Sequence, residues 1–354
     1  MTRRLCFLVL LLMTQPVVAA SHCVILQYHH FSEQTPAITS VSVKQFEDHL
    51  QYIQDNGFQV MALRDVVFAL RHQRELPEKC VSLTVDDAYI SVYQNAYPRL
   101  KQRAWPFTVF VSTQEVDNGI SSVMNWQQMR EMSQHGASFE NHGHAHLHMI
   151  RKLSDETDQA WLKRIGQDIE HAQQRLIQEI GIAPTLLAYT FGEYSPALMA
   201  QVQGMGLTAF GQHSGPAWPA ANFGALPRFP MAAQYADMEG FSIKINSLPL
   251  LVVHAEPSDP LVELGNWRPT LQLSLAPGSY SRNNLRCYVS GSDAVEMRWS
   301  ETEKDNVSIT PTFDLKPGRH RSNCTMPAAQ EGQFHWYSHN WFIRHQDGSW
   351  YAEY

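Results

Sequence analysis

A short run of histidines is the part of this chain whose side chains are best suited to binding a metal. Four of the 17 histidines lie between His142 and His148, at every second position, and neutral imidazole is the commonest side-chain ligand for zinc-like metals. Two pairs have the i, i+4 spacing that one turn of helix would direct to one point, His142 with His146 and His144 with His148. A catalytic metal site adds a third ligand, often a carboxylate, and keeps one position for water. The run is therefore either part of such a site or a solvated histidine-rich loop.

Two adjacent carboxylates upstream provide the missing kind of ligand. Asp86 and Asp87 follow the segment 81–85, whose apolar and β-branched residues are typical of a buried strand. Successive strand residues point to opposite faces, so both carboxylates can reach one site only where the strand gives way to a loop. Near a cation, one carboxylate can bind the metal while the other accepts a proton from water. A single aspartate would more simply be a helix N-cap, but the pair and the histidine run together favour a metal site.

The acidic segment and the histidine run resemble the motifs of one known family. Thr-Val-Asp-Asp at 84–87 is similar to the Thr-Phe-Asp-Asp motif of the polysaccharide deacetylases of carbohydrate esterase family 4, the NodB homology domain. Asn-His-x-x-x-His at 141–146 is similar to the second motif of that family. The resemblance implies an irregular (β/α) barrel that hydrolyses acetyl groups with the help of a metal.

Three more segments resemble this family in the right order. Residues 24–30, which end in Tyr-His-His, are similar to the first strand of the poly-N-acetylglucosamine deacetylase branch, and residues 188–195 are similar to the third motif of that branch. Leu-Pro-Arg at 226–228 is similar to a later segment that supplies an active-site arginine, here Arg228. The resemblance therefore covers the chain from about residue 24 to residue 230.

The resemblance implies which residues bind the metal. Asp86 would be the general base and Asp87 the first metal ligand. His142 and His146 would complete the ligand set, because an Asn-His pair precedes the first histidine ligand in the family and Asn141 fits this pattern. The other two histidines of the run would then lie behind the ligands, face the substrate or be solvated. The implied cofactor is a divalent metal, with zinc as the first expectation.

The remaining implied residues surround the substrate. The backbone N–H of Phe191 would bind the oxyanion, and Tyr189, His29 and His144 complete the expected set of substrate and oxyanion residues. Hydrolysis also needs an acid that protonates the leaving amine, and in the family a histidine of a later Leu-x-His motif does so. Leu-Val-Val-His at 251–254 makes His254 the best pattern match, although His213 and His29 compete with it. The expected catalytic residues are therefore Asp86, Arg228 and His254.

Two residues depart from the family pattern. Thr190 stands where the third motif has proline, which leaves the backbone there less rigid. Gly143 stands where the second motif has serine or threonine, which removes a hydroxyl that orients the ligand loop. Both changes are expected to affect metal affinity and rate more than the type of reaction.

The N-terminus predicts export. Residues 1–20 contain Arg3 and Arg4, an apolar stretch and small residues before a cleavage site near Ala20, the pattern of a signal peptide. The protein is therefore expected to be secreted or periplasmic, with no membrane span. Without the two arginines the chain has 25 basic residues against 34 acidic ones, a net charge of −9. Such a charge argues against binding to nucleic acid or to an anionic membrane surface.

The cysteines agree with an oxidising compartment. Beyond Cys6 the chain has an even number of cysteines, and exported proteins commonly pair them. Cys23 and Cys80 each begin a predicted strand, so they would lie close together if those strands were neighbours in a parallel sheet. Cys287 and Cys324 both lie in the C-terminal region and would form the second disulfide.

Patterns along the chain predict two domains. Strand-like and helical segments alternate to about residue 250, which indicates a parallel sheet with its site at the carboxyl ends of the strands. Residues 154–180 are typical of a long amphipathic helix, capped by Ser154 and ended by Gly181. Short alternating strands follow, and five tryptophans there are expected mainly to pack in a core. The expected organisation is α/β: a signal peptide at 1–20, a (β/α) barrel deacetylase domain at 21–254 and a small β-sandwich at 255–354.

These features together predict a secreted, metal-dependent N-deacetylase. Its expected substrate is a glycan that contains N-acetylglucosamine, and the protein is expected to be a monomer. One alternative is a catalytically impaired glycan-binding protein of the same fold, and another is an O-deacetylase of acetylated sugars. Retention of both Asp86 and Asp87 favours an enzyme, because a pure binding protein needs no general base.

Overall fold

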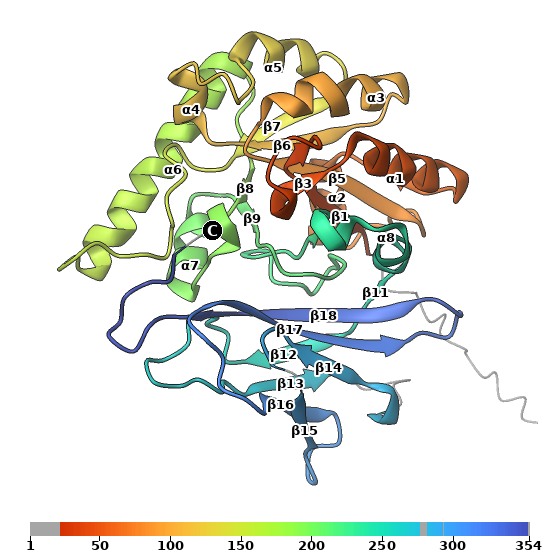
Figure 1. The fold of residues 1–354 in the computed structure, drawn as a ribbon, viewed down its shortest axis with the longest axis vertical. Coiled ribbons are helices and arrows are strands. Elements are labelled where there is room, and N and C mark those ends of the chain that lie inside the picture. Colours follow the sequence, from red (N-terminus) through yellow and green to blue (C-terminus); the bar gives the residue numbers. More distant parts are fainter. Residues whose placement is uncertain (1–21, 277–281, 293, 353–354) are drawn as a thin grey trace, which may run out of the picture.

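The protein forms two units that pack against each other (Figure 1). The structure is a computed structural model that describes residues 22–276, 282–292 and 294–352, so the predicted signal peptide lies outside the described residues. The N-terminal unit combines helices with a central sheet, and the C-terminal unit consists mainly of strands. Among the helices described, none is long and apolar enough to cross a membrane.

A curved parallel sheet forms the centre of the N-terminal unit. Its strands pair in the order β10-β1-β5-β6-β7-β8-β9, with β4 beside β5, and all of these pairings are parallel. A parallel bridge from Phe210 to Leu226 brings the last strand toward the first, so the sheet curls into an incomplete barrel, as the sequence predicts. The strands are β1 (Val24–Tyr28), β4 (Gln59–Val60), β5 (Cys80–Asp86), β6 (Phe107–Val111), β7 (Ala137–Asn141), β8 (Leu186–Ala188), β9 (Thr208–Phe210) and β10 (Phe229–Pro230).

Helices cover the outside of this sheet (Figure 1). β1 and β5 are buried along their whole length, because a parallel sheet is covered on both faces. The helices are α1 (Val43–Asp55), α2 (Leu63–Arg71), α3 (Tyr97–Gln102), α4 (Thr113–Asp117), α5 (Trp126–Ser133), α6 (Asp158–Ile180), α7 (Pro196–Gly204) and α8 (Met238–Ile245). The short strands β2 (His30–Phe31) and β3 (Ser40–Val41) pair separately.

The long helix α6 begins later than its sequence pattern predicts. Thr157, and not Ser154, is the N-cap, because its hydroxyl accepts the N–H of Ala160 at 3.2 Å. The predicted end is confirmed, since Gly181 adopts a left-handed φ of 84° and closes the helix.

The C-terminal unit is a sandwich of two four-stranded sheets. One sheet has the order β11-β18-β17-β14 and the other β12-β13-β16-β15, and apolar residues of both sheets share one core. The strands are β11 (Leu248–Pro249), β12 (Val252–Glu256), β13 (Leu271–Leu275), β14 (Arg286–Val289), β15 (Val295–Trp299), β16 (Asn306–Pro311), β17 (Gly318–Pro327) and β18 (Phe334–Ile343). The domain boundary predicted after residue 254 therefore falls inside β12, and the sandwich takes its first strand from residue 248.

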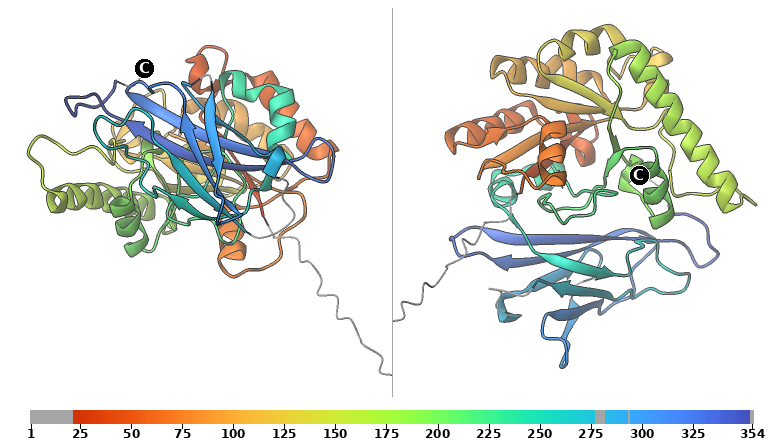
Figure 2. Two further views of the ribbon diagram at one scale, coloured as in Figure 1. Left: turned by 90° about the horizontal axis from the view of Figure 1, so that it is seen from below. Right: turned by 180° about the vertical axis from the view of Figure 1, so that it is seen from behind.

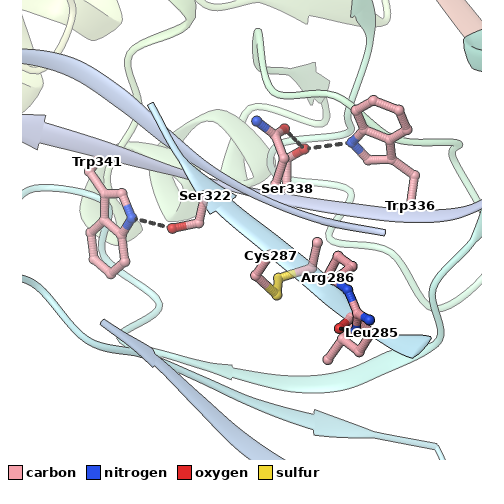
Figure 3. The surroundings of a disulfide bond; sticks show 9 residues. Leu285, Arg286, Cys287, Ser322, Trp336, Ser338 and Trp341 are labelled. Atoms are coloured by element: carbon pink, nitrogen blue, oxygen red, sulfur yellow. Dashed lines mark hydrogen bonds between the residues drawn. A yellow bond between two sulfur atoms is a disulfide. The ribbon is translucent and has the colours of Figure 1, made fainter. Parts of the chain in front are cut away.

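Both expected disulfides are formed. Cys23 and Cys80 begin the neighbouring strands β1 and β5 and are bonded to each other. Cys287 and Cys324 lie directly opposite each other on β14 and β17 (Figure 3). The first disulfide therefore links two strands of the barrel, and the second links two strands of the sandwich.

The sheet that contains β18 faces the barrel. Figure 2 shows from behind that β18 runs along the contact between the two units. Phe342 on β18 packs into an apolar cluster of the barrel, and the ring of Trp336 meets the ring of Phe229 edge to face, with 5.3 Å between their centroids. The C-terminal unit is thus joined to the barrel by buried apolar contacts.

Candidate metal centre

The two aspartates lie at the carboxyl end of β5, in the middle of the sheet. Asp86 is the last residue of the strand, and Asp87 and Ala88 have left-handed φ values of 71° and 53°. Aspartate tolerates this conformation better than most residues. The tight turn allows both carboxylates to reach the same end of the sheet, although adjacent strand residues would point to opposite faces.

Asp87, His142 and His146 converge on one point. Oδ1 of Asp87 lies 3.2 Å from Nε2 of His142 and 3.1 Å from Nε2 of His146. One ligand atom from each residue lies within 4.8 Å of the others. Nδ1 of His142 is 2.8 Å from the carbonyl oxygen of Ala188 and must donate to it, which leaves the lone pair of Nε2 free to bind a metal.

The three residues fit a divalent metal. Oδ1 of Asp87 is buried and accepts no hydrogen bond of good geometry from the described residues, although two ring nitrogens lie beside it. A buried carboxylate oxygen next to two nitrogen lone pairs is stable only if a cation lies between them. Two ligand atoms of one tetrahedral zinc lie roughly 3.3–3.6 Å apart, close to the separations found here.

Asp86 is held beside this group by a buried arginine. Nη1 and Nη2 of Arg228 donate to Oδ1 and Oδ2 of Asp86 at 2.7 and 2.8 Å, and Nε2 of Gln27 donates to Oδ2 at 2.7 Å. Burial alone would raise the pKa of Asp86, but the charge and hydrogen bonds of Arg228, with smaller effects of His142 and His29, hold it below its usual value. Asp86 is therefore a carboxylate that stays ionised and oriented next to the three candidate ligands.

The other two histidines of the run point elsewhere. The ring of His144 stacks on the ring of His171 at 3.8 Å, and its Nδ1 lies 2.8 Å from the hydroxyl of Thr113. The ring of His148 stacks on Phe191 at 3.7 Å, and its Nδ1 lies 2.9 Å from Oε2 of Glu193. Neither ring joins Asp87.

A carboxylate from α6 shapes the histidine loop. Asp168 accepts the backbone N–H groups of His144 and Ala145 at 2.9 and 3.0 Å. Gly143 has a left-handed φ of 75°, and a Cβ at this position would lie 2.7 Å from a carboxylate oxygen of Asp168. Glycine therefore lets Asp168 approach and orient the loop, a task that the sequence resemblance assigns to a hydroxyl.

The turn that follows β8 brings the aromatic ring of Phe191 next to the candidate metal ligands. Phe191 has a left-handed φ of 58°, and its ring meets the ring of His146 edge to face, with 4.7 Å between their centroids. The hydroxyl of Thr190, which replaces the family's proline, donates to the carbonyl of Leu147. This bond ties the turn to the histidine loop and supplies the rigidity that proline would give.

The sandwich reaches the same turn. Arg319 on β17 donates to the carbonyl oxygen of Phe191, and its guanidinium lies over the Phe191 ring at 5.9 Å. The hydroxyl of Tyr351 donates to Oε1 of the buried Glu193 at 2.7 Å, and Arg151 donates to the same oxygen at 3.1 Å. Side chains of the C-terminal unit therefore help to fix the backbone next to the candidate metal site.

Known proteins resemble this chain in both sequence and fold. Residues 73–210 match the family model described as polysaccharide deacetylase. The chain is 31% identical over 173 residues to YxkH of Bacillus subtilis, which carries a provisional polysaccharide deacetylase name, and the match covers 48% of this chain and 57% of that protein. It is 24% identical over 157 residues to a poly-β-1,6-N-acetyl-D-glucosamine N-deacetylase of Staphylococcus aureus, covering 43% of this chain and 54% of the relative. The matches therefore span little more than half of each relative.

Residues 73–210 of the chain are thus similar to the polysaccharide deacetylase family. Solved structures agree on the fold. The deacetylase PplD of Streptococcus pyogenes superposes with a TM-score of 0.58 at 23% identity, covering 64% of this chain and 99% of that one. IcaB of Ammonifex degensii superposes with a TM-score of 0.55 at 22% identity, covering 62% and 95%.

Two of the predicted site residues lie elsewhere. His254 lies on β12 of the sandwich with its side chain 67% exposed, and its ring faces Glu256 at 3.9 Å, so the prediction that it acts at the metal site is wrong. Tyr189 is fully buried, and its hydroxyl donates to the carbonyl of Gly224 instead of facing a substrate. In both cases the sequence pattern could not give the direction of the side chain.

His29 is the competing histidine that lies at the site. Its Nε2 is 4.0 Å from Oδ2 of Asp86, and its side chain is 15% exposed. Burial lowers its pKa, and the neighbouring Asp86 and Asp87 only partly offset this effect. The third candidate, His213, is buried near Tyr194, with 5.8 Å between the ring centroids.

The sequence patterns also missed residues that support the site. Gln27 has a local signal, since it is an amide within an otherwise apolar buried strand. Glu193 lies within the segment that resembles the third motif, but no role was inferred for it. Arg319 and Tyr351 have no local signal, because only the packing of the sandwich brings them to the turn at Phe191.

Proposed function

We propose that this protein is a secreted N-deacetylase of glycans that contain N-acetylglucosamine, with a divalent metal held by Asp87, His142 and His146. The observation that carries the proposal is the pairing of these three residues with Asp86. Arg228 and Gln27 donate to the Asp86 carboxylate and orient it beside the ligand set. A site that only bound a metal would not need a second buried, ionised carboxylate.

The side chains around the metal site have matching tasks. A divalent ion bound there lowers the pKa of a water molecule and polarises the acetyl carbonyl. Asp86 accepts the proton of the attacking water, and Arg228 keeps the carboxylate ionised and oriented for this transfer. The backbone N–H of Phe191 donates to the oxyanion that forms on the acetyl oxygen.

His29 completes the reaction as the general acid. Its Nε2 lies 4.0 Å from Oδ2 of Asp86. When the C–N bond breaks, the electron pair stays on the nitrogen, and His29 gives that nitrogen a proton. The products are acetate and a free amine on the sugar. Because burial lowers the pKa of His29, the proton that it delivers comes from Asp86, 4.0 Å away, which has taken it from the attacking water.

Substrate, metal and compartment follow from separate observations. The S. aureus relative is named for the N-deacetylation of poly-β-1,6-N-acetyl-D-glucosamine, which supports an N-acetylglucosamine substrate. Two imidazoles and one carboxylate are a donor set that suits zinc. Two disulfides favour an oxidising compartment, outside the cytoplasm or in the periplasm.

Acetate release from β-linked N-acetylglucosamine oligomers tests this function. The full chain, loaded with zinc, should release acetate, and a chelator should stop the release. Asp86→Asn should lower kcat by about 10²- to 10⁴-fold, because the general base is lost, while the zinc affinity stays within about tenfold. Asp48→Asn, on the exposed face of α1, is the matched control and should behave as the wild type.

The outcomes separate the alternatives. Full activity of Asp86→Asn would show that another group is the base. Acetate release from O-acetylated but not from N-acetylated sugars would replace the proposal with an O-deacetylase. A chain that binds zinc and glycan but releases no acetate from any acetylated sugar would be a binding protein of the same fold.

A further inference from the structure

A cavity lies between the barrel and the sandwich, apart from the metal ligands. Its volume is about 260 Å³, and its walls come from the segment 213–227 between β9 and β10, from the region of β12 and from β18. Its exposed lining residues mark its mouth: Ala220, Asn222, Val253, His254 and Ser258. Asp86, Asp87 and the histidine ligands are not part of its wall.

The described residues that line this cavity carry no carboxylate, ammonium or guanidinium group. Its polar groups are the hydroxyls, amide and imidazoles of serine, tyrosine, asparagine and histidine. Burial lowers the pKa of His213 to about 3 and that of His339 to about 4, so both imidazoles are neutral near pH 7. A cationic ligand would lose its hydration here without gaining an opposite charge, because the buried arginines behind His213, Arg321 and Arg228, are cationic as well. The lining therefore favours a neutral, polar ligand.

Two of these imidazoles have unused hydrogen-bonding capacity. His213 and His339 are only 8% and 6% exposed. Nδ1 of His213 and Nε2 of His339 are buried without a hydrogen-bond partner among the described residues. A neutral imidazole can donate from one nitrogen and accept at the other, and leaving buried polar atoms unpaired costs stability. Both atoms are closed to solvent, so a ligand would reach them only after a small shift of the surrounding side chains.

Tryptophan rings supply the apolar part of the wall. Nε1 of Trp336 already donates to the hydroxyl of Ser338 at 3.1 Å (Figure 3), so this indole offers the cavity only its ring surface. Trp218, which also lines the cavity, is half-buried. The C–H groups on the face of a pyranose ring are weakly positive and pack well on the negative face of an indole.

We propose that this cavity binds one neutral sugar ring of a glycan, at a site separate from the metal centre. Aromatic surfaces would hold the C–H face of the ring, and the neutral polar groups would pair with its hydroxyls. The volume of about 260 Å³ is just below the range of drug-sized ligand sites, which begins at about 300 Å³, and therefore suits one ring. The inference does not rest on the proposed deacetylase activity, because binding here needs neither Asp86 nor a metal.

Calorimetric titration of the metal-free full chain tests the site. The probe is the β-linked disaccharide of N-acetylglucosamine, compared with its fully deacetylated, cationic form. The neutral disaccharide should bind saturably, and the cationic form should bind at least about tenfold more weakly, because the lining offers its ammonium groups no counter-charge. Trp218→Ala should lower the affinity for the neutral disaccharide by about tenfold, because one stacking surface is lost.

A second variant and two controls exclude trivial explanations. Ala220→Trp adds bulk at the exposed mouth, where the fold tolerates it, and should also weaken binding. Trp299→Ala, on β15 away from the cavity, and His146→Ala, at the metal site, should bind the probe as the wild type does. The proposal is overturned if the wild type binds no neutral disaccharide. Equal affinity of the wild type, Trp218→Ala and Ala220→Trp would overturn it as well.

Discussion

His142 and His146 converge on Asp87, whereas His144 and His148, which have the same spacing two residues farther along, turn to different parts of the protein. His144 packs on α6 through His171, and His148 supports Glu193 behind the turn at Phe191. One pair forms the candidate metal site, and the other pair holds the loops around it in place.

The backbone of the run explains why equal spacings lead to different places. The segment is not a helical turn, which the i, i+4 spacing would allow, but a loop with left-handed residues at Gly143 and His146. In such a loop the direction of each side chain depends on the local turn and on distant partners. Spacing alone therefore identifies possible ligands but cannot choose between them.

Removal of a metal ligand should have the largest effect, and it should separate the two histidine pairs by their zinc affinity. His142→Ala should weaken zinc binding by at least about 100-fold, because one of three protein ligands is lost. His148→Ala should change the affinity by less than about tenfold, because its ring contacts Glu193 and Phe191 but not the metal position. Competition with a chromophoric chelator measures both affinities. Similar losses in the two variants would contradict the assignment of the pairs.

Gly143→Ala should disturb both histidine pairs at once, because it lies in the loop that carries them. Its Cβ would lie 2.7 Å from the carboxylate of Asp168, in a left-handed conformation that alanine disfavours. We expect a loss of about 1–3 kcal/mol in the free energy of unfolding and weaker zinc binding. Denaturant unfolding and chelator competition measure these effects. Gly204→Ala, in α7 with open space around its Cα, is the control and should not be destabilised.

Glu193→Gln should weaken the hydrogen bonds by which His148 and its neighbours hold the turn at Phe191 in place. The buried carboxylate accepts from Arg151 and Tyr351, and the variant should lose about 1–3 kcal/mol of unfolding free energy at neutral pH. Burial opposes ionisation of Glu193, but His148, Arg151 and Tyr351 outweigh it and lower its pKa. The unfolded chain therefore takes up this proton at a higher pH than the folded protein does.

The wild type should accordingly lose the contribution of Glu193 to the free energy of unfolding as the pH falls below the ordinary glutamate pKa of about 4.3. The variant lacks this group and should show a flatter dependence of stability on pH between 5 and 3. Thermal unfolding over this range measures the difference. Glu170→Gln, exposed on α6, is the control and should follow the wild type.

His144→Ala should have the smallest effect. Its ring is partly exposed and contacts only His171 and Thr113, so we expect less than about 1 kcal/mol of destabilisation and unchanged zinc affinity. Thermal unfolding and chelator competition would measure both. Loss of zinc binding in this variant would mean that the loop can shift by two residues and use the second pair.

Much of the fold and part of the site could be predicted because the signals are local. The buried strand at 81–85 placed Asp86 and Asp87 at a strand end, and Gly181 ended α6 as predicted. The start of α6 was missed because serine and threonine at nearby positions compete as caps. His254 was misassigned because a short pattern was matched without knowing that its strand belongs to the sandwich.

The sequence by itself determined the resemblance to the deacetylase family, the strand that carries the two aspartates and the cysteine pairs. These features depend on residue types at fixed separations along the chain. Only the tertiary structure decided which histidines meet Asp87, that His29 lies beside Asp86, and that Arg319 and Tyr351 reach the turn at Phe191. The reason is physical. Asp168, Glu193 and the sandwich lie far from the histidine run in sequence, and their contacts with the loops set the directions of the side chains.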